Sequence, residues 1–310
     1  MVLKLEGITK SYKNLKVLHG IDLTIDKGQL VSIIGPSGAG KTTLLKIIAG
    51  LEKADSGNVI NTTGHRAILV FQDYLLFPMM NVYENIAFGL KAARIDKSAI
   101  SKRVKSILDS FSLLDKIRAY PAELSAGQKQ RACIARAMVL EPEMLLLDEP
   151  FANLDKNLKL EMAEFIRSKQ QEYGTAALLV THDQQEAFMI SDRIGIMIDG
   201  RLIQYGTAGN IYGRPVSIEA ASFLGHVNII PEKLRQSMFQ GVLLDGGKAY
   251  ARAESFRIEK DPAGNAVVMA VVFTGRFIIY RVLIEDWICT VYRLEGGIET
   301  GDKVRISIIA

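Results

Sequence analysis

The feature that constrains this chain most is a glycine-rich loop between an apolar run and a helical pattern. Residues 35–42 read Gly-Pro-Ser-Gly-Ala-Gly-Lys-Thr, which fits the pattern G-x-x-x-x-G-K-[ST]. The apolar run Gln29 to Ile34 comes directly before the loop, and residues 43–50 have the apolar spacing of a helix. A strand, a glycine-rich loop and a helix in this order are typical of a phosphate-binding P-loop. The order therefore predicts an α/β fold built around this loop.

The residues of the loop also predict its chemistry. Glycines let backbone N–H groups converge on a phosphate, and the start of a helix adds a positive dipole. Lys41 is expected to meet the β- and γ-phosphates as a point charge, and Thr42 to bind Mg²⁺ through its hydroxyl. The alternative, a glycine-rich turn with a solvated lysine, is disfavoured by the complete motif in this context. The residues predicted to hold the nucleotide phosphates are Gly35, Pro36, Ser37, Gly38, Ala39, Gly40, Lys41, Thr42 and Thr43.

A second acidic motif follows the apolar run Met144 to Leu147. A buried parallel strand that ends at Asp148 would place a carboxylate at the edge of the sheet beside the P-loop. Asp148 is expected to hold Mg²⁺ through water, and Glu149 to polarise an attacking water. A strand that simply ends in two solvated acids is the alternative, and the P-loop in the same chain argues against it.

A third motif narrows the class of protein. Residues 124–131 read Leu-Ser-Ala-Gly-Gln-Lys-Gln-Arg. With this motif the chain resembles the ATP-binding-cassette (ABC) ATPases, whose signature usually reads L-S-G-G-Q. Ala126 replaces the first glycine, which matters only if that position needs a positive φ. Ser125 and Gln128 also form a capping box for the next helix, and the two interpretations are compatible. The resemblance implies that Ser125, Gly127 and Gln128 face the γ-phosphate bound on a partner subunit, so that ATP is sandwiched between two chains.

Four further positions match the family pattern. The resemblance implies that Tyr12 stacks on adenine and that Gln72 reaches Mg²⁺ or the lytic water. It also implies that Asp155 belongs to a loop at the dimer interface and that His182 contacts the γ-phosphate. The alternatives are a surface tyrosine at position 12 and a simple helix N-cap at Asp155. The interval between Lys41 and Gln72 is shorter than is usual in the family, and residues 56–64 look like a trimmed version of its antiparallel flap.

The change in sequence pattern along the chain predicts two domains. We expect an α/β, P-loop NTPase ABC cassette at residues 1–225, in which the apolar run Arg66 to Phe71 is one of the strands. Its helical subdomain is expected at about 73–142, with a capping box at Asn81 and Glu84. A small all-β, OB-like regulatory domain (TOBE) is expected at 226–310. Short strand-like runs such as Gln240 to Leu244, separated by turn dipeptides such as Gly246-Gly247, indicate the β-rich part. Arg252-Ala253-Glu254 looks like a degenerate form of the R-P-E motif of such domains. This second domain is expected to stabilise a dimer, with solute sensing as the alternative.

Residues 71–86 closely resemble prokaryotic solute importers, in which the region after Gln72 receives a helix from a permease. The apolar residues expected at that surface are Leu76, Phe77, Met79, Met80 and Val82. The resemblance implies the energy-coupling ATPase of an importer in the polyamine, ferric-iron, sulfate, molybdate and sugar group, and we expect a polyamine or ferric-iron type. The implied partners are a second copy, integral membrane permease subunits and, indirectly, an extracytoplasmic solute-binding protein. The implied cofactors are ATP and Mg²⁺.

Composition removes other classes of function. The formal net charge is +4, and no run of like charges exists, so a nucleic-acid partner is not expected. Cys133 and Cys289 are far apart in sequence, which excludes a disulfide framework. No apolar window is long enough for a spanning helix and no signal-peptide pattern opens the sequence, so we expect a peripheral protein at the cytoplasmic face of the membrane. A soluble ABC ATPase acting away from the membrane, a small-molecule kinase and a non-enzymatic regulator are the alternative functions.

Overall fold

The computed structural model describes residues 1–61, 67–237, 239 and 242–309. Contacts divide the chain into two compact units, Met1–Ile211 and Tyr212–Ala310. The contact boundary lies before the expected one at 225/226, so the segment between them packs with the second unit. One cause is Arg252, whose Nη1 donates a hydrogen bond to the Ala221 carbonyl.

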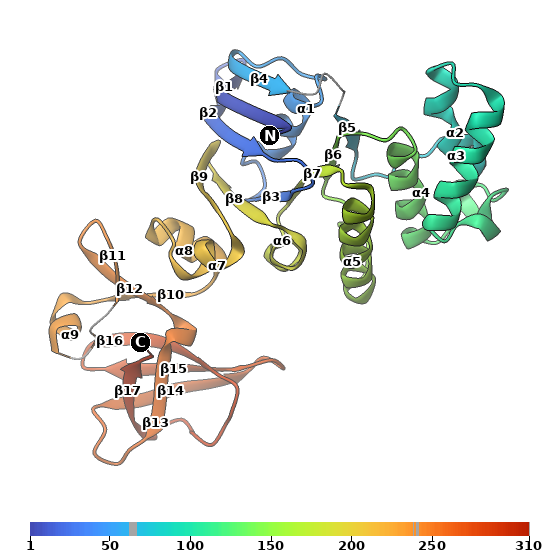
Figure 1. Cartoon of the computed structure of the whole chain (residues 1–310). Coiled ribbons are helices and arrows are strands. Elements are labelled where there is room, and N and C mark those ends of the chain that lie inside the picture. The colour runs from blue at the N-terminus through green and yellow to red at the C-terminus, as the bar shows by residue number, and fades with distance from the viewer. Residues whose placement is uncertain (62–66, 238, 240–241, 310) are drawn as a thin grey trace. The chain divides into compact units, whose positions relative to one another are not determined.

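The first unit is built on a six-stranded sheet with the strand order β5-β6-β7-β3-β8-β9 (Figure 1). All neighbouring strands run parallel except β9, which pairs antiparallel with β8. Helices α1, α5 and α6 lie between strands in the chain, so the predicted α/β fold is confirmed. The bounds are β3 Leu30–Ile34, α1 Lys41–Ile48, β5 Ile68–Val70, β6 Met144–Asp148, α5 Lys156–Tyr173, β7 Ala176–Thr181, α6 Gln184–Ile190, β8 Arg193–Ile198 and β9 Arg201–Gly206.

The central strands of this sheet are uninterrupted apolar runs because both faces are covered. In β6, Leu145 and Leu147 pack into a core with the helical part of the unit. Met144 and Leu146, which alternate with them, pack into a second core with α1 and the N-terminal strands. Successive side chains of a strand point to opposite faces, so a strand buried on both sides needs apolar residues throughout.

A three-stranded antiparallel sheet covers one face of the unit and was not predicted. Its order is β2-β1-β4, from β1 (Leu3–Tyr12), β2 (Leu15–Ile25) and β4 (Ser56–Asn61). The register between β1 and β2 shifts after Leu5, beside Gly7 with a φ of 58°. Such a bulge breaks the alternation by which a half-buried strand is recognised. The trimmed flap corresponds to β4, and its predicted residues 62–64 lie outside the described residues, as does Arg66 of the predicted strand 66–71.

The helical insertion is a group of helices that contact one another, α2 (Val82–Ala92), α3 (Lys97–Ser110) and α4 (Ala126–Met138) (Figure 1). Two short 3-10 turns, η1 (Leu114–Lys116) and η2 (Pro121–Glu123), lie between α3 and α4. The predicted capping box of α2 is confirmed, because Asn81 and Glu84 exchange two side-chain to backbone hydrogen bonds of 2.9 Å. Residues 73–80 form turns rather than helix.

The second unit is antiparallel throughout and has its own core. Its two sheets have the orders β10-β12-β11 and β13-β17-β14-β15-β16, which fits the expected OB-like domain. Predicted residues 240 and 241 lie outside the described residues. The bounds are α7 Ala208–Gly213 (which begins in the first unit), α8 Ile218–Leu224, β10 Val227–Ile230, α9 Glu232–Ser237, β11 Leu243–Asp245, β12 Lys248–Arg252, η3 Ala253–Ser255, β13 Phe256–Lys260, β14 Ala266–Phe273, β15 Ile278–Ile284, β16 Trp287–Arg293 and β17 Lys303–Ile308.

Within the described residues, none of the helices has both the length and the apolar character required to span a bilayer.

Candidate functional site

The glycine-rich loop connects the end of β3 to the start of α1, at the carboxyl edge of the six-stranded sheet. Two of its glycines are sterically required. A Cβ on Gly35 would lie 2.0 Å from the Met197 carbonyl oxygen. Gly40 has a φ of 94°, and a Cβ there would lie 2.9 Å from the Val17 carbonyl oxygen. The backbone of the loop is therefore packed closely against β2 and β8, and its N–H groups begin the helix α1.

Lys41 is held inside this loop. Its Nζ donates hydrogen bonds to the carbonyl oxygens of Gly35 at 2.8 Å and Pro36 at 2.9 Å. The residue is only 6% exposed. Burial lowers the pKa of Lys41, and the nearby carboxylates of Glu149 and Asp148 oppose that change. The cation is thus placed where a polyanion at the loop would meet it.

Thr42 and Asp148 are brought together from distant parts of the chain. Thr42 Oγ1 donates to Asp148 Oδ1 at 3.0 Å, and Asp148 ends β6 beside the loop. Burial raises the pKa of Asp148, while the hydrogen bond from Thr42 lowers it. A hydroxyl and a carboxylate are oxygen donors of the kind that Mg²⁺ takes. The described residues contain no group of three or more His, Cys, Asp or Glu that could hold a metal ion.

Glu149 and His182 meet at the ends of neighbouring strands. His182 Nδ1 lies 3.2 Å from Glu149 Oε2, and the donor depends on the tautomer. The chain turns sharply at Glu149, which has a φ of 43° and donates its backbone N–H to the Val180 carbonyl at 3.0 Å. A non-glycine residue in this region of φ is uncommon and marks a position where the fold fixes the side chain's direction.

Lys41, Thr42 and Glu149 line one cleft of about 250 Å³. Asp148 and His182 are not part of its lining, but each lies within hydrogen-bond distance of a lining residue, Thr42 and Glu149 respectively. The predicted loop residues Gly35 and Pro36 face Lys41, and Ala39 is buried in the core instead of lining the cleft. The cleft is lined by Val17, Ser37, Gly38, Gly40, Lys41, Thr42, Thr43 and Glu149.

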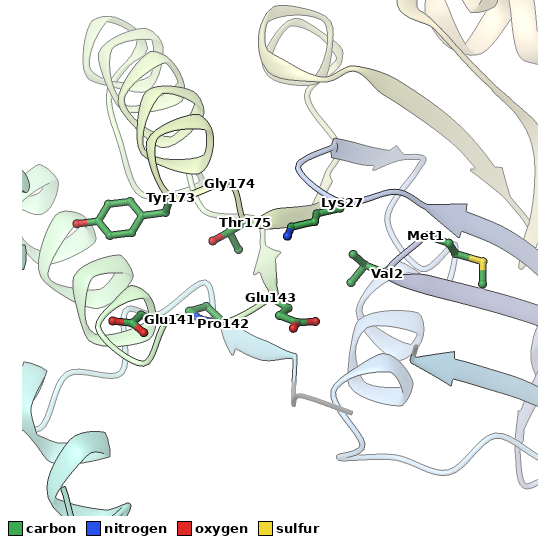
Figure 2. A pocket seen from close by; sticks show the side chains of 9 residues that line it. All are labelled: Met1, Val2, Lys27, Glu141, Pro142, Glu143, Tyr173, Gly174 and Thr175. Atoms are coloured by element: carbon green, nitrogen blue, oxygen red, sulfur yellow. The ribbon is translucent and has the colours of Figure 1, made fainter. Parts of the chain in front are cut away.

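A separate cavity of about 400 Å³ lies at the opposite edge of the same sheet (Figure 2). Glu143 and Thr175, which line it, come directly before β6 and β7, and Lys27 comes shortly before β3. This is the amino edge of the strands, whereas ligands of open α/β sheets bind at the carboxyl edge. The cavity contains none of the residues predicted to act on a nucleotide.

The remaining predicted residues lie outside the lining of the cleft. Tyr12 ends β1 and is 43% exposed, with Lys10 Nζ 5.3 Å from its ring centroid. Gln72 is exposed, and its carbonyl oxygen accepts a hydrogen bond from Asn153 Nδ2 at 3.3 Å. A single chain therefore places the aromatic ring and the glutamine at the surface of the unit.

The predicted capping box at Ser125 is confirmed, and Asp155 is an N-cap, the alternative that the sequence left open. Ser125 and Gln128 form the capping box of α4, with hydrogen bonds of 3.3 Å and 3.0 Å. Asp155 Oδ1 accepts the backbone N–H groups of the first turn of α5. Ala126 is not among the described residues with positive φ, so the methyl group in place of the usual glycine brings no backbone strain. A Cβ on Gly127 would lie 3.3 Å from Leu158 of α5, so the starts of the two helices are neighbours.

Sequence reasoning missed two residues of this region. Val17 lines the cleft from β2, a strand that was not predicted. Glu186 is buried one helical turn after His182 and binds Thr181, the residue before the histidine. The sequence signal for Glu186 was its spacing from His182, because residues four positions apart lie over the same turn where a helix begins.

Comparisons with known proteins agree with this geometry. The profile of the ABC transporter family matches residues 18–152. Two relatives from strains of Bacillus cereus, both named sulfate/thiosulfate import ATP-binding protein CysA, are 43% and 42% identical over 242 residues. Each of these alignments covers 74% of this chain and 68% of the relative.

Solved structures give the same result. The protein cbiO1 from Clostridium perfringens, described as part of the ABC transporter complex cbiONQ, has a TM-score of 0.64 and 29% identity. The match covers 69% of this chain and 91% of cbiO1. Two dimeric structures of the ATP-binding cassette MJ0796, one of them bound to ADP and Pi, each have a TM-score of 0.59 and 30% identity, covering 66% of this chain and 98% of theirs. The chain thus belongs to the ATP-binding subunits of ABC transporters, and it is an importer-type ATPase.

Proposed function

We propose that this chain hydrolyses ATP with the residues that surround the cleft. The observation that carries the proposal is the convergence of Lys41, the Thr42–Asp148 pair and the Glu149–His182 pair at one edge of the sheet. Lys41 and the loop N–H groups would neutralise the phosphates, and Glu149 would orient the attacking water. His182 would contact the γ-phosphate. Thr42 and Asp148, with Gln72, would hold Mg²⁺, which neutralises charge on the phosphate oxygens.

The proposed working form is a dimer that closes around two nucleotides. In a single chain, Ser125, Gly127 and Gln128 do not line the cleft. They form the start of α4, where Ser125 is exposed, Gln128 is half-buried and Gly127 is buried. The hydroxyl of Ser125 and the positive end of the helix dipole suit an anion supplied by another molecule. The dimeric form of the related MJ0796 cassette supports this arrangement. Asp155 lies beside them, because the starts of α4 and α5 are neighbours.

We further propose that a permease helix docks in an apolar groove between α2, α4 and β5. The groove has a volume of about 390 Å³. Phe77 and Phe88 lie on its wall with ring centroids 4.6 Å apart, and Arg136 donates to the Leu75 carbonyl at 2.8 Å. Such a concave apolar wall beside exposed side chains suits a short amphipathic helix. The groove is lined by Ile68, Leu69, Val70, Phe71, Leu75, Phe77, Phe88, Gly89, Cys133, Arg136, Ala137 and Leu140.

Part of the predicted docking surface was wrong. Val82 is 1% exposed and belongs to the core of the helical insertion. Met79, in contrast, is 86% exposed, and Phe77 is 38% exposed. Leu76 and Met80 are half-buried. The cause is the capped start of α2, which turns the first helical residue inward and leaves the preceding turn outside.

For the solute we propose sulfate or thiosulfate. The support is the name and the identity of the two Bacillus cereus relatives. The comparisons give no support to the polyamine or ferric-iron type that the sequence suggested. Through the permease, the chain would lie at the cytoplasmic face of the membrane, and an extracytoplasmic binding protein would deliver the anion. The β-rich residues 226–310 would stabilise the dimer.

The test is uptake of ³⁵S-labelled sulfate and thiosulfate by cells that lack this subunit. The wild-type chain should restore uptake, and Glu149→Gln and Phe88→Asp should not. Leu244→Asp, at an exposed apolar residue of the second unit, is the matched control and should restore it. Restored uptake of a polyamine or of ferric iron, with none of either anion, would contradict the proposed solute.

A further inference from the structure

The segment that carries His182 is fixed by contacts that the proposed hydrolytic roles do not explain. The His182 side chain is 55% exposed, and its Nδ1 lies 3.2 Å from Glu149 Oε2. An exposed imidazole held by one hydrogen bond keeps its direction only if the backbone beneath it is fixed. The neighbours on both sides of His182, namely Thr181 and Asp183, provide that support.

The hydroxyl of Thr181 connects the backbone of Asp183 to the side chain of Glu186. Its Oγ1 accepts the backbone N–H of Asp183 at 3.0 Å. The same oxygen donates to Glu186 Oε2 at 2.5 Å. Asp183 Oδ1 in turn caps α6 by accepting the N–H groups of Gln185 and Glu186. The turn that carries His182 is therefore held by hydrogen bonds among Thr181, Asp183 and Glu186.

Glu186 also connects this turn to another helix. Its Oε1 accepts a hydrogen bond from Lys159 Nζ at 3.1 Å. Lys159 lies in the first turn of α5, and its backbone N–H donates to the Asp155 carbonyl at 2.9 Å. Glu186 is 6% exposed, and burial raises its pKa while the bonds from Thr181 and Lys159 oppose that change. A charge this well buried is expensive unless it is paired, so its two partners define its position.

We propose that Glu186 is a positioning residue for the hydrolysis reaction. It holds the turn of Thr181 and Asp183 so that His182 faces Glu149, and it ties that geometry to the start of α5, which Asp155 caps. The inference rests on the proposed roles of His182 and Glu149. Because Lys41 donates its hydrogen bonds to the loop's own carbonyl oxygens and makes none to Glu186, the loss of Glu186 should leave ATP binding unchanged.

The experiment measures kcat, KM for ATP, equilibrium ATP binding and Tm on the purified full chain. Glu186→Ala should lower kcat by roughly tenfold or more, because small displacements of a catalytic group are costly, with KM within about twofold. Glu186→Gln keeps an acceptor for Thr181 and should recover part of kcat. Thr181→Val, which keeps the shape and loses the hydroxyl, should lower kcat as Glu186→Ala does.

A double-mutant cycle separates positioning from general damage. In the His182→Ala background, Glu186→Ala should cause no further loss of kcat, because the group it positions is gone. The matched control is Asp192→Asn. Asp192 follows α6 and pairs with Arg167 of α5, but it also accepts the N–H of Leu30 at the amino edge of β3. This variant should lower Tm and leave kcat within about twofold of wild type.

The outcomes distinguish the two claims. If His182→Ala lowers kcat while Glu186→Ala and Thr181→Val do not, the positioning role is overturned and the role of His182 stands. If the losses of His182→Ala and Glu186→Ala add, or if Asp192→Asn lowers kcat equally, Glu186 acts only on stability. If His182→Ala retains full kcat, the proposed role of His182 fails and the inference fails with it.

Discussion

At the scale of single residues, the site depends on groups that come from three strand ends. Lys41 and Thr42 follow β3, Asp148 ends β6 with Glu149 directly after it, and His182 follows β7. Parallel neighbours bring these ends to one edge, so residues more than a hundred positions apart in sequence form hydrogen bonds. The strand ends therefore place the functional side chains without the help of a long loop.

Lys41→Ala should abolish measurable ATP binding by the full chain. The variant removes the buried ammonium that lies between the loop carbonyls and the two carboxylates, and leaves uncompensated negative charge where phosphates would bind. Equilibrium titration with a fluorescent ATP analogue measures the effect. Lys46→Ala, on the same helix, is the control and should bind as wild type. Unchanged affinity in Lys41→Ala would refute the assignment of the phosphate site.

Most of the site could be predicted at this scale because its motifs are contiguous in sequence. The P-loop and the acids after β6 each carry their context with them. Val17 could not be found, because the bulge beside Gly7 hides the strand pair that presents it. Glu186 could not be assigned a role, because its partner Lys159 lies on another helix and only the fold brings them together.

At the scale of elements, N-cap residues decide where helices begin, and tertiary contacts decide where some of the helices pack. Asn81, Ser125 and Asp155 each occupy the N-cap of a helix. The sequence predicted the first two and left the cap at Asp155 as an alternative. The position of α7 and α8 was not predictable, because it depends on a tertiary contact. Arg252 of β12 donates to the carbonyls of Tyr212 at 3.1 Å and Ala221 at 3.2 Å, and its guanidinium lies 4.0 Å from the Tyr212 ring centroid.

Arg252→Met should destabilise the second unit. The variant keeps most of the apolar stem but leaves two carbonyls without their donor, a change worth about 2–4 kcal/mol in total for buried groups. Arg257→Met is the control, since the Arg257 side chain is 66% exposed and pairs with an exposed glutamate, and should cost about 0–1 kcal/mol. Urea unfolding followed by Trp287 fluorescence measures both. Equal midpoints for the two variants would contradict the role given to Arg252.

At the scale of the whole molecule, we propose that each nucleotide site is completed by another chain. Hydrolysis would then be a property of pairs of chains. Ser125→Arg should block hydrolysis while ATP binding to the single chain stays within about twofold of wild type, because Ser125 does not line its own cleft. Filter binding and a phosphate-release assay give the two readouts.

Mixtures of two inactive variants also test whether each site is shared between two chains. Ser125→Arg and Lys41→Ala chains should each be inactive alone, yet a mixed pair contains one intact composite site and should regain part of the hydrolysis rate. A chain that carries both changes should not restore hydrolysis when it is mixed with the Lys41→Ala chain, because neither chain then has Lys41. Activity of Ser125→Arg alone at the wild-type rate would mean that one chain hydrolyses ATP without a partner's α4.

We propose that the apolar groove beside Phe77 and Phe88 couples this ATPase to a membrane permease. Affinity purification of the tagged chain from gently solubilised native membranes, with the bound proteins identified by mass spectrometry, tests this coupling. Permease subunits should co-purify with the wild-type chain and with Leu244→Asp, and Phe88→Asp should lose them while its ATP binding and Tm stay unchanged. Recovery of the wild-type chain alone or with soluble partners only, or equal permease recovery with Phe88→Asp, would contradict this role of the groove.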